Sequence, residues 1–308
     1  MEIVTLKDKN NIQATNGTVL VLGYFDGIHL GHKALFDRAR KIADQKGLTV
    51  SVLTFPESPR LAFARFTPDL LLQLTSPEKR FSLMEAYGVD RLYLTDFTSQ
   101  FASQSPEEFI ANYVTALNAR ILVTGFDYHF GNRRADVNDL KELFNGKVEV
   151  IEEVQLDGEK ISSTRIRKAI QEGNVAEANH LLGYTFTTEG IVVHGDARGR
   201  VIGYPTANLA PFERVHLPSD GVYVAEVEVD GQRYRSMASV GKNVTFDGTE
   251  MRIEAHIFGF NQEIYGQKIT IFWLEKIRGM VKFDGMESLL NQMKEDEKTA
   301  INWNEKKD

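Results

Sequence analysis

The hydrophobic pattern of this chain changes in kind near residue 183, and this change constrains the fold more than any other feature. Before it, short β-branched and apolar runs alternate with segments whose apolar residues recur at helical spacing. After it, apolar and polar residues alternate with period two, and no helical segment intervenes until the end of the chain. A chain of 308 residues has room for about two domains. We therefore predict one domain over residues 1–183 and a second over residues 184–308.

The first domain is predicted to be a doubly wound parallel sheet of Rossmann-like type, because strands that alternate with helices form parallel sheets covered on both faces. The expected strands are residues 18–22, 48–55, 91–94, 120–124 and 147–154. The expected helices are residues 33–45, 78–87, 106–117, 136–144, 165–172 and 175–182. Gly183 follows the last helix, where glycine commonly ends a helix.

The second domain is predicted to be an antiparallel β-barrel with a terminal helix. Its expected strands are residues 187–193, 222–229, 233–240, 250–258 and 268–274, and Asp230-Gly231 is a hairpin signal between two of them. In the terminal helix Asp284 is the expected cap, and the helix is expected to cover the barrel. Its apolar stripe comprises Met286, Leu289, Leu290 and Met293.

Composition excludes several functions. The formal net charge of −7 argues against a nucleic-acid-binding surface and requires any anion site to be local. The chain has no cysteine, which excludes disulfides and thiolate metal sites. It contains no run of ~18 apolar residues and begins without a basic and apolar leader, so we expect a cytoplasmic protein with no membrane role.

Residues 23–32, Gly-Tyr-Phe-Asp-Gly-Ile-His-Leu-Gly-His, follow an expected strand and open a helix. This is where open α/β sheets bind ligands. Gly27 and Gly31 let the backbone approach a ligand, the helix N-terminus attracts anions, and His29 and His32 can donate to phosphate oxygens. On the local residues alone, glycines that serve a turn and histidines that cap the helix are an equal alternative.

Two further segments lie at predicted strand ends. Residues 161–167, Ile-Ser-Ser-Thr-Arg-Ile-Arg, open a helix with hydroxyls and two arginines, although alone they are also a good capping sequence. Residues 125–131, Gly-Phe-Asp-Tyr-His-Phe-Gly, carry aromatic rings that could stack on a flat heterocycle, although such rings are more often core.

Residues 190–209 combine several glycines and two arginines with the tetrad Pro205-Thr206-Ala207-Asn208. Mobile backbone with basic side chains suits a loop that covers phosphates, and Thr206 and Asn208 supply the hard oxygens that Mg²⁺ prefers. The alternative is a glycine-rich surface loop with an Asx turn.

Together these segments resemble the prokaryotic family of bifunctional riboflavin kinase/FMN adenylyltransferases. The resemblance implies two ATP-dependent reactions, riboflavin to FMN with release of ADP, and FMN to FAD with release of pyrophosphate. In the adenylyltransferase it implies that ATP is bound by Gly23, Phe25, Asp26, Gly27, Gly31, Ser163 and Thr164. The implied catalytic residues there are His29, His32 and Arg167, and the implied flavin-binding candidates are Asp127 and Phe130.

For the kinase, the resemblance implies a nucleotide loop with Gly195, Gly199, Arg200, Gly203 and Pro205. It also implies Mg²⁺ ligation by Thr206 and Asn208, and a general-base role for Glu254 on a later strand. The other histidines, His180, His194, His216 and His256, are expected to be structural or exposed.

The chain departs from the adenylyltransferase part of the family pattern at two places. Ser58 stands where the family's Thr-Phe-x-Pro-His-Pro has histidine, and Ala135 stands where a glycine is usual. These changes leave open a riboflavin kinase with an impaired adenylyltransferase domain. A non-catalytic flavin-binding regulator is a further alternative, against which the intact set of His32, Arg167, Thr206, Asn208 and Glu254 argues.

Overall fold

The computed structural model describes residues 1–7, 16–196, 198–212, 214–242 and 251–304. Its contacts divide the chain into two compact units, Met1–Ser163 and Thr164–Asp308. The helices of residues 164–182 thus belong to the second unit, whereas the domain boundary at residue 183 was drawn from the sequence pattern and stays a prediction.

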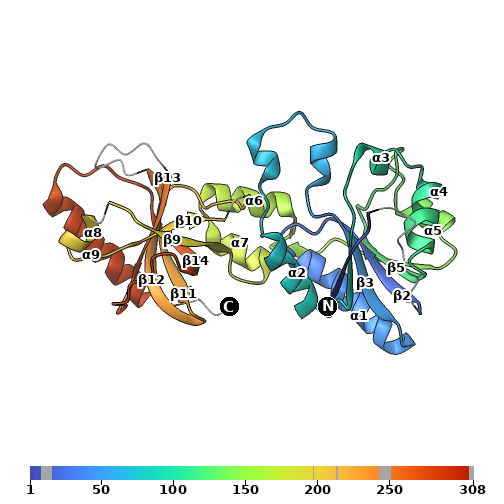
Figure 1. Ribbon diagram of the computed structural model, residues 1–308, viewed down its shortest axis with the longest axis horizontal. Helices are drawn as coiled ribbons and strands as arrows, with labels where there is room; N and C mark the ends of the chain where they lie inside the picture. The colour runs from blue at the N-terminus through green and yellow to red at the C-terminus, as the bar shows by residue number, and fades with distance from the viewer. Residues whose placement is uncertain (8–15, 197, 213, 243–250, 305–308) are drawn as a thin grey trace. The chain divides into compact units, whose positions relative to one another are not determined.

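The first unit is built on a six-stranded sheet in the order β1-β4-β3-β2-β5-β6, and every adjacent pair is parallel (Figure 1). The predicted doubly wound parallel sheet is therefore confirmed, and the edge strand β1 was not predicted. A short hairpin, β7 and β8, follows the sheet. The strands are β1 (Glu2–Thr5), β2 (Thr18–Leu22), β3 (Thr49–Thr54), β4 (Arg91–Leu94), β5 (Ala119–Gly125), β6 (Lys147–Ile151), β7 (Gln155–Leu156) and β8 (Glu159–Lys160).

Helices cover both faces of this sheet. Val19 and Val21 pack with α1 and α2 on one face. Leu20 and Leu22 alternate with them and pack on the other face, against α4, α5 and the π-helical segment after α4. The helices are α1 (Leu30–Lys46), α2 (Pro77–Ala86), α3 (Ser99–Ala102), α4 (Pro106–Phe109), the π-helix η4 (Ile110–Thr115) and α5 (Val137–Leu143), with 3₁₀ turns η2 (Pro59–Ala62) and η3 (Pro68–Leu71).

The strand order reverses between β2 and β5. From β2 the chain proceeds to β3 and β4 on one side, then crosses to β5 on the other side of β2. Ligands of open α/β sheets bind outside the carboxyl ends of the strands at such a reversal. Gly23 directly follows β2, and Gly125 ends β5, so both predicted segments lie at this point.

The second unit is a closed antiparallel barrel in the order β10-β13-β12-β11-β14-β9, which confirms the predicted barrel. The amide of Asn179 on α7 donates to the carbonyl of Trp273 over 2.8 Å, and this contact ties α7 to the barrel. The strand β10, which starts inside the Pro-Thr-Ala-Asn tetrad, was not predicted; Glu250 of the expected fourth strand lies outside the described residues. The elements are α6 (Ser163–Glu172), α7 (Val175–Leu182), β9 (Thr187–Val193), α8 (Arg198–Val201), β10 (Ala207–Pro211), β11 (Gly221–Val229), β12 (Gln232–Lys242), β13 (Met251–Ile257), β14 (Lys268–Arg278) and α9 (Met286–Asn302).

Helix α9 lies along one side of the barrel, as predicted (Figure 1). The buried carboxylate of Asp296 accepts from the guanidinium of Arg278 on β14 through two nitrogens, at 2.7 and 3.0 Å. Two details of the prediction were wrong. Gly285 is the N-cap residue and the helix has no side-chain cap, because it begins one residue too late for Asp284. Met286 is 47% exposed and lies outside the packed stripe.

Candidate active sites

The turn between β2 and α1 has an unusual backbone. Phe25, Gly27 and Ile28 all have positive φ angles, of 61°, 84° and 37°. The rings and methyls of Phe25 and Ile28 are buried in the core, and this burial offsets the conformational cost of left-handed backbone. A Cβ at Gly23 would lie 2.6 Å from the Phe25 ring, so any other residue there would displace that buried ring.

Asp26 and Ser163 hold this turn from within. The carboxylate of Asp26 is 3% exposed and accepts from the backbone N–H of Leu74 over 2.8 Å. The backbone carbonyl of Asp26 accepts from the Ser163 hydroxyl over 2.8 Å. The fold therefore joins two predicted segments, residues 23–32 and 161–167, through a direct hydrogen bond.

His29 and His32 form a stacked pair at the start of α1. Their ring centroids lie 3.6 Å apart with an interplanar angle of 17°. His29 is the N-cap residue, and its Nδ1 accepts from the backbone N–H of His32 over 3.3 Å. A neutral His29 ring therefore carries its proton on Nε2. Burial, and then the neighbouring His29, hold the pKa of His32 well below its ordinary value, so His32 is a neutral hydrogen-bonding group at physiological pH.

Arg80 supports the same turn and was missed by the sequence analysis. Its side chain is fully buried, and its guanidinium donates to the carbonyls of Tyr24, Phe55 and Pro56 at 2.9–3.3 Å. It thereby holds the segment after β3 against the turn after β2. Ser58, which replaces the family histidine in that segment, caps η2 by accepting from the backbone N–H of Arg60.

The segment after β5 contributes a charged pair. Asp127 accepts from Lys160 over 2.6 Å, and the Lys160 ammonium lies 4.5 Å from the centroid of the exposed Phe126 ring. Lys160 was not predicted, since a lone lysine carries no distinguishing signal. Phe130 is only 6% exposed and packs beside Phe109 in the core, so its assignment to flavin binding stays a prediction that this packing does not favour.

Thr164 and Arg167 lie in the first two turns of α6, where Thr164 is exposed and Arg167 is partly exposed. Both belong to the second compact unit. Their roles in adenylyl transfer stay predictions from the family resemblance.

A cluster of oxygen ligands lies on β13, on β10 and at Thr206, the residue before β10. The Thr206 hydroxyl donates to the Glu254 carboxylate over 3.2 Å, and Asn208 is the register partner of Glu254 in the antiparallel ladder. A hydroxyl, an amide oxygen and a carboxylate are the ligand types that Mg²⁺ takes beside water and phosphate. These residues therefore fit the predicted ion.

The glycines of the preceding loop make room for this cluster. A Cβ at Gly195 would lie 2.3 Å from the Asn208 amide, and one at Gly199 would lie 2.1 Å from the Tyr204 carbonyl oxygen. Gly203 has a φ of 84°, which favours glycine.

Side-chain contacts hold the same loop to the barrel. Asp196 pairs with Arg252 over 2.9 Å, and the His194 ring stacks on Tyr265 at 3.8 Å. Arg200 donates to the Tyr265 hydroxyl over 3.2 Å.

A pocket opens beside Thr206, with one basic side chain, two aromatic rings and an apolar floor. From the predicted set it includes Arg200, Pro205 and Thr206, but Asn208 and Glu254 do not line it. The lining residues are Val192, Arg200, Pro205, Thr206, Ala207, Ala255, Ile257, Phe260, Gln262, Glu263, Ile264 and Tyr265. An apolar floor with a few polar groups suits a flat heterocycle.

Comparison with known proteins gives two matches in the order of the two units. A family model for FAD synthetase matches residues 11–165, and one for riboflavin kinase matches residues 182–304. The bifunctional riboflavin kinase/FMN adenylyltransferase of Listeria monocytogenes is 43% identical over 283 residues, or 91% of this chain and 90% of that protein. The Bacillus subtilis protein of the same name is 38% identical over 292 residues, or 93% and 92% of the two chains.

One solved structure is similar over the whole chain. The crystal structure of a macrolide-efflux protein from Streptococcus pneumoniae has a TM-score of 0.93 and 50% identity, covering 99% of this chain and 100% of that one. In the part of the chain that the structure describes, no helix combines the length and apolar character needed to cross a membrane.

Proposed function

This chain belongs to the family of bifunctional riboflavin kinase/FMN adenylyltransferases, and we propose how its residues divide the two reactions. It is an enzyme that uses ATP to phosphorylate riboflavin to FMN, and ATP again to adenylylate FMN to FAD. Both family matches occur in one chain, and neither a kinase with an impaired partner domain nor a non-catalytic regulator gains support from the comparisons.

For the kinase, we propose that Glu254 is the general base and that Thr206 and Asn208 hold Mg²⁺. The 3.2 Å contact between Thr206 and Glu254 carries this proposal, because it places a carboxylate beside the metal-ligand candidates. Glu254 would accept the proton of the riboflavin hydroxyl as its oxygen attacks the γ-phosphorus of ATP, and ADP would leave. Bound Mg²⁺ would neutralise phosphate charge.

The pocket beside Thr206 is the proposed nucleotide site of the kinase. Phe260 and Tyr265 could flank a flat base, and Arg200 supplies positive charge near the predicted phosphate loop.

For adenylyl transfer, we propose that His29, His32 and the N-terminus of α1 stabilise the charge that develops on the α-phosphate. The 17-residue α1 has no acidic residue in its first turn to offset its positive end. The FMN phosphate would attack the α-phosphorus directly, with no protein nucleophile, and pyrophosphate would leave. The assignment of Thr164 to ATP and of Arg167 to the departing pyrophosphate rests on the family resemblance.

Two substitutions test the division of labour. Purified protein is incubated with Mg²⁺-ATP and either riboflavin or FMN, in oxidised and reduced form, and FMN and FAD are quantified by chromatography. Glu254→Gln is expected to abolish FMN formation and to leave FAD formation from FMN unchanged, and His32→Ala is expected to do the reverse.

Glu287→Gln, at an exposed position of α9, is the matched control and should leave both steps intact. Full kinase activity in Glu254→Gln would contradict the assigned base. Accumulation of FMN without FAD in the unsubstituted protein would revive the impaired-adenylyltransferase alternative. A cytoplasmic location and the lack of a nucleic-acid partner stay predictions.

A further inference from the structure

His256 lies two residues beyond Glu254 on β13, and the pleat places both side chains on the same face of the strand. The buried neighbours Ile253, Ala255 and Ile257 point to the opposite face. The His256 Nδ1 lies 2.7 Å from the carbonyl oxygen of Pro205. Because a carbonyl oxygen only accepts, Nδ1 carries the proton and donates it.

This hydrogen bond occupies a place that the β-ladder does not reach. The pairing of β10 with β13 comprises Ala207 with Ala255 and Asn208 with Glu254. Pro205 precedes this ladder and, as a proline, has no N–H to donate. The His256 side chain therefore hydrogen-bonds the Pro205–Thr206 peptide, which the backbone pairing of β10 with β13 does not include.

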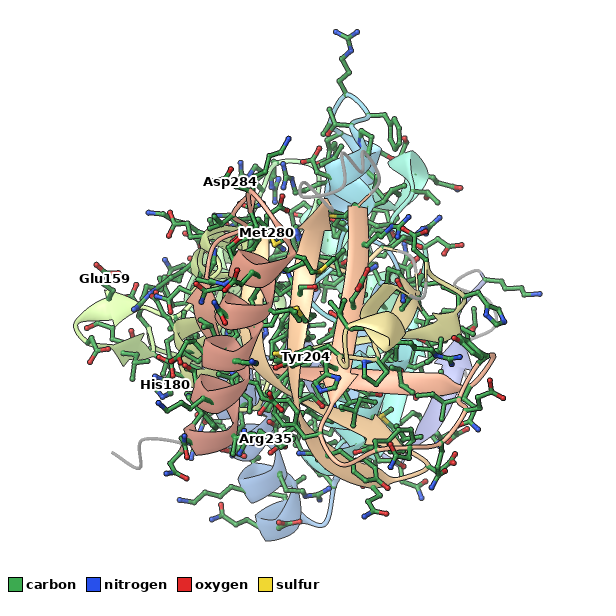
Figure 2. The ribbon with its side chains drawn as sticks, turned by 90° about the vertical axis from the view of Figure 1, so that its left-hand side faces the viewer. Glu159, His180, Tyr204, Arg235, Met280 and Asp284 are labelled. Carbon is green, nitrogen blue, oxygen red and sulfur yellow. The ribbon has the colours of Figure 1, made fainter. Side chains whose placement is uncertain are left out.

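Two more contacts stabilise the same position. The His256 ring packs edge-on against the rings of Tyr204 and Phe258, with centroid distances of 5.2 and 5.5 Å. The Tyr204 hydroxyl donates to Glu297 of α9 over 3.0 Å, and Figure 2 shows Tyr204 beside this helix. The residues on either side of the Tyr204–Pro205 peptide are thus tied to β13 and to α9.

We propose that His256 is a positioning residue of the kinase, which holds the Pro205 carbonyl so that the Thr206 hydroxyl faces Glu254. In this proposal His256 acts through Thr206, by way of its contact with the Pro205 carbonyl. The inference rests on the kinase roles proposed above for Thr206 and Glu254.

Two single variants and one double variant test it, with Thr206→Ala alone as the reference for the double variant. His256→Phe keeps an aromatic ring between Tyr204 and Phe258 but removes the donor, and is expected to lower the kinase kcat by about 10- to 100-fold because the reacting groups lose their alignment. The KM for riboflavin is expected to change less than about 3-fold, since the substrate contacts remain. His256→Asn can place an N–H where Nδ1 lies and should recover kcat to within about 3-fold of the unsubstituted protein. Because His256 acts through Thr206, His256→Phe combined with Thr206→Ala should be no slower than Thr206→Ala alone.

A measurement without turnover tests the same contact. Long-range ¹H–¹⁵N spectra of the full-length protein at alkaline pH should show His256 as the Nδ1–H tautomer, assigned by the signal that His256→Phe removes. An Nε2–H tautomer would overturn the proposal, as would a kinase kcat in His256→Phe equal to that of the unsubstituted protein.

The two proposals fail in different ways. FAD formation from FMN provides an internal control for folding, and it should be unchanged in all four variants, Thr206→Ala included. If Glu254→Gln is inactive while His256→Phe is fully active, only the positioning role is wrong. If Glu254→Gln keeps full kinase activity, the proposed base is wrong whatever His256→Phe does.

Discussion

Replacing Gly195 by alanine tests whether the rate of the kinase reaction depends on the exact position of the Asn208 amide. The added Cβ would lie 2.3 Å from the Asn208 Nδ2 and 2.5 Å from its Oδ1, whereas ordinary contacts begin at 3.4 Å. Gly195 does not have a positive φ, so the change acts through this contact rather than through backbone strain. The Asn208 amide must move by about 1 Å or rotate away, and a displacement of that size can cost about 100-fold in rate, or about 2.7 kcal/mol of transition-state stabilisation.

The assay measures kcat/KM for FMN formation from riboflavin and, in the same preparation, FAD formation from FMN. We expect Gly195→Ala to lower the first about 100-fold and to leave the second unchanged. Gly279→Ala is the matched control, because that glycine also lacks a positive φ and a Cβ there meets nothing within 4 Å. Kinase activity in Gly195→Ala within about 3-fold of Gly279→Ala would refute the reasoning, since one amide 1 Å out of place should cost far more.

Two further predictions concern stability. Asp296→Ala leaves the Arg278 guanidinium without its buried carboxylate and should destabilise the second unit by about 3 kcal/mol. In a circular dichroism melt the unfolding midpoint of this unit should fall by about 10 °C, and a decrease of less than about 3 °C would contradict the prediction. The pKa of His32 is lowered in the folded protein, so the unfolded chain binds the proton first and stability falls as the pH drops below about 6.5. Between pH 6.5 and 5.5 the free energy of unfolding, measured in urea, should therefore fall by up to about 1 kcal/mol less in His32→Gln than in the unsubstituted protein. Equal decreases in the two proteins would contradict the lowered pKa of His32.

The hydrophobic pattern was sufficient for the architecture, because it depends on local periodicity. Strands β2 and β4 and helix α7 begin and end at the predicted residues, since each is bounded by turn or capping residues. The strand β1 escaped prediction because a short edge strand gains its pairing from β4, far along the chain. The cap of α9 was predicted at Asp284, but the helix begins at Met286 and Gly285 is therefore its N-cap residue.

Candidate site residues could be found from motifs, but their contacts could not. Nothing in the local sequence distinguishes Arg80 from a solvated helix residue, yet the fold buries it under three carbonyls. His256 was expected to be structural or exposed, but its contact with Pro205 could not be predicted, because that residue lies far away in the sequence. Phe130 packs in the core while its assignment to flavin binding stays a prediction, because the sequence alone does not separate a core ring from a stacking ring.

The sequence by itself determined the two-part architecture and the residues that resemble the family signatures, since periodicity and motif order are properties of neighbouring residues. Only the tertiary structure decided which of those residues meet. The closing of the barrel sets Thr206 against Glu254, and the reversal of strand order places Gly23 and Gly125 at one edge of the sheet. Such juxtapositions depend on pairings between distant strands, which local sequence does not encode.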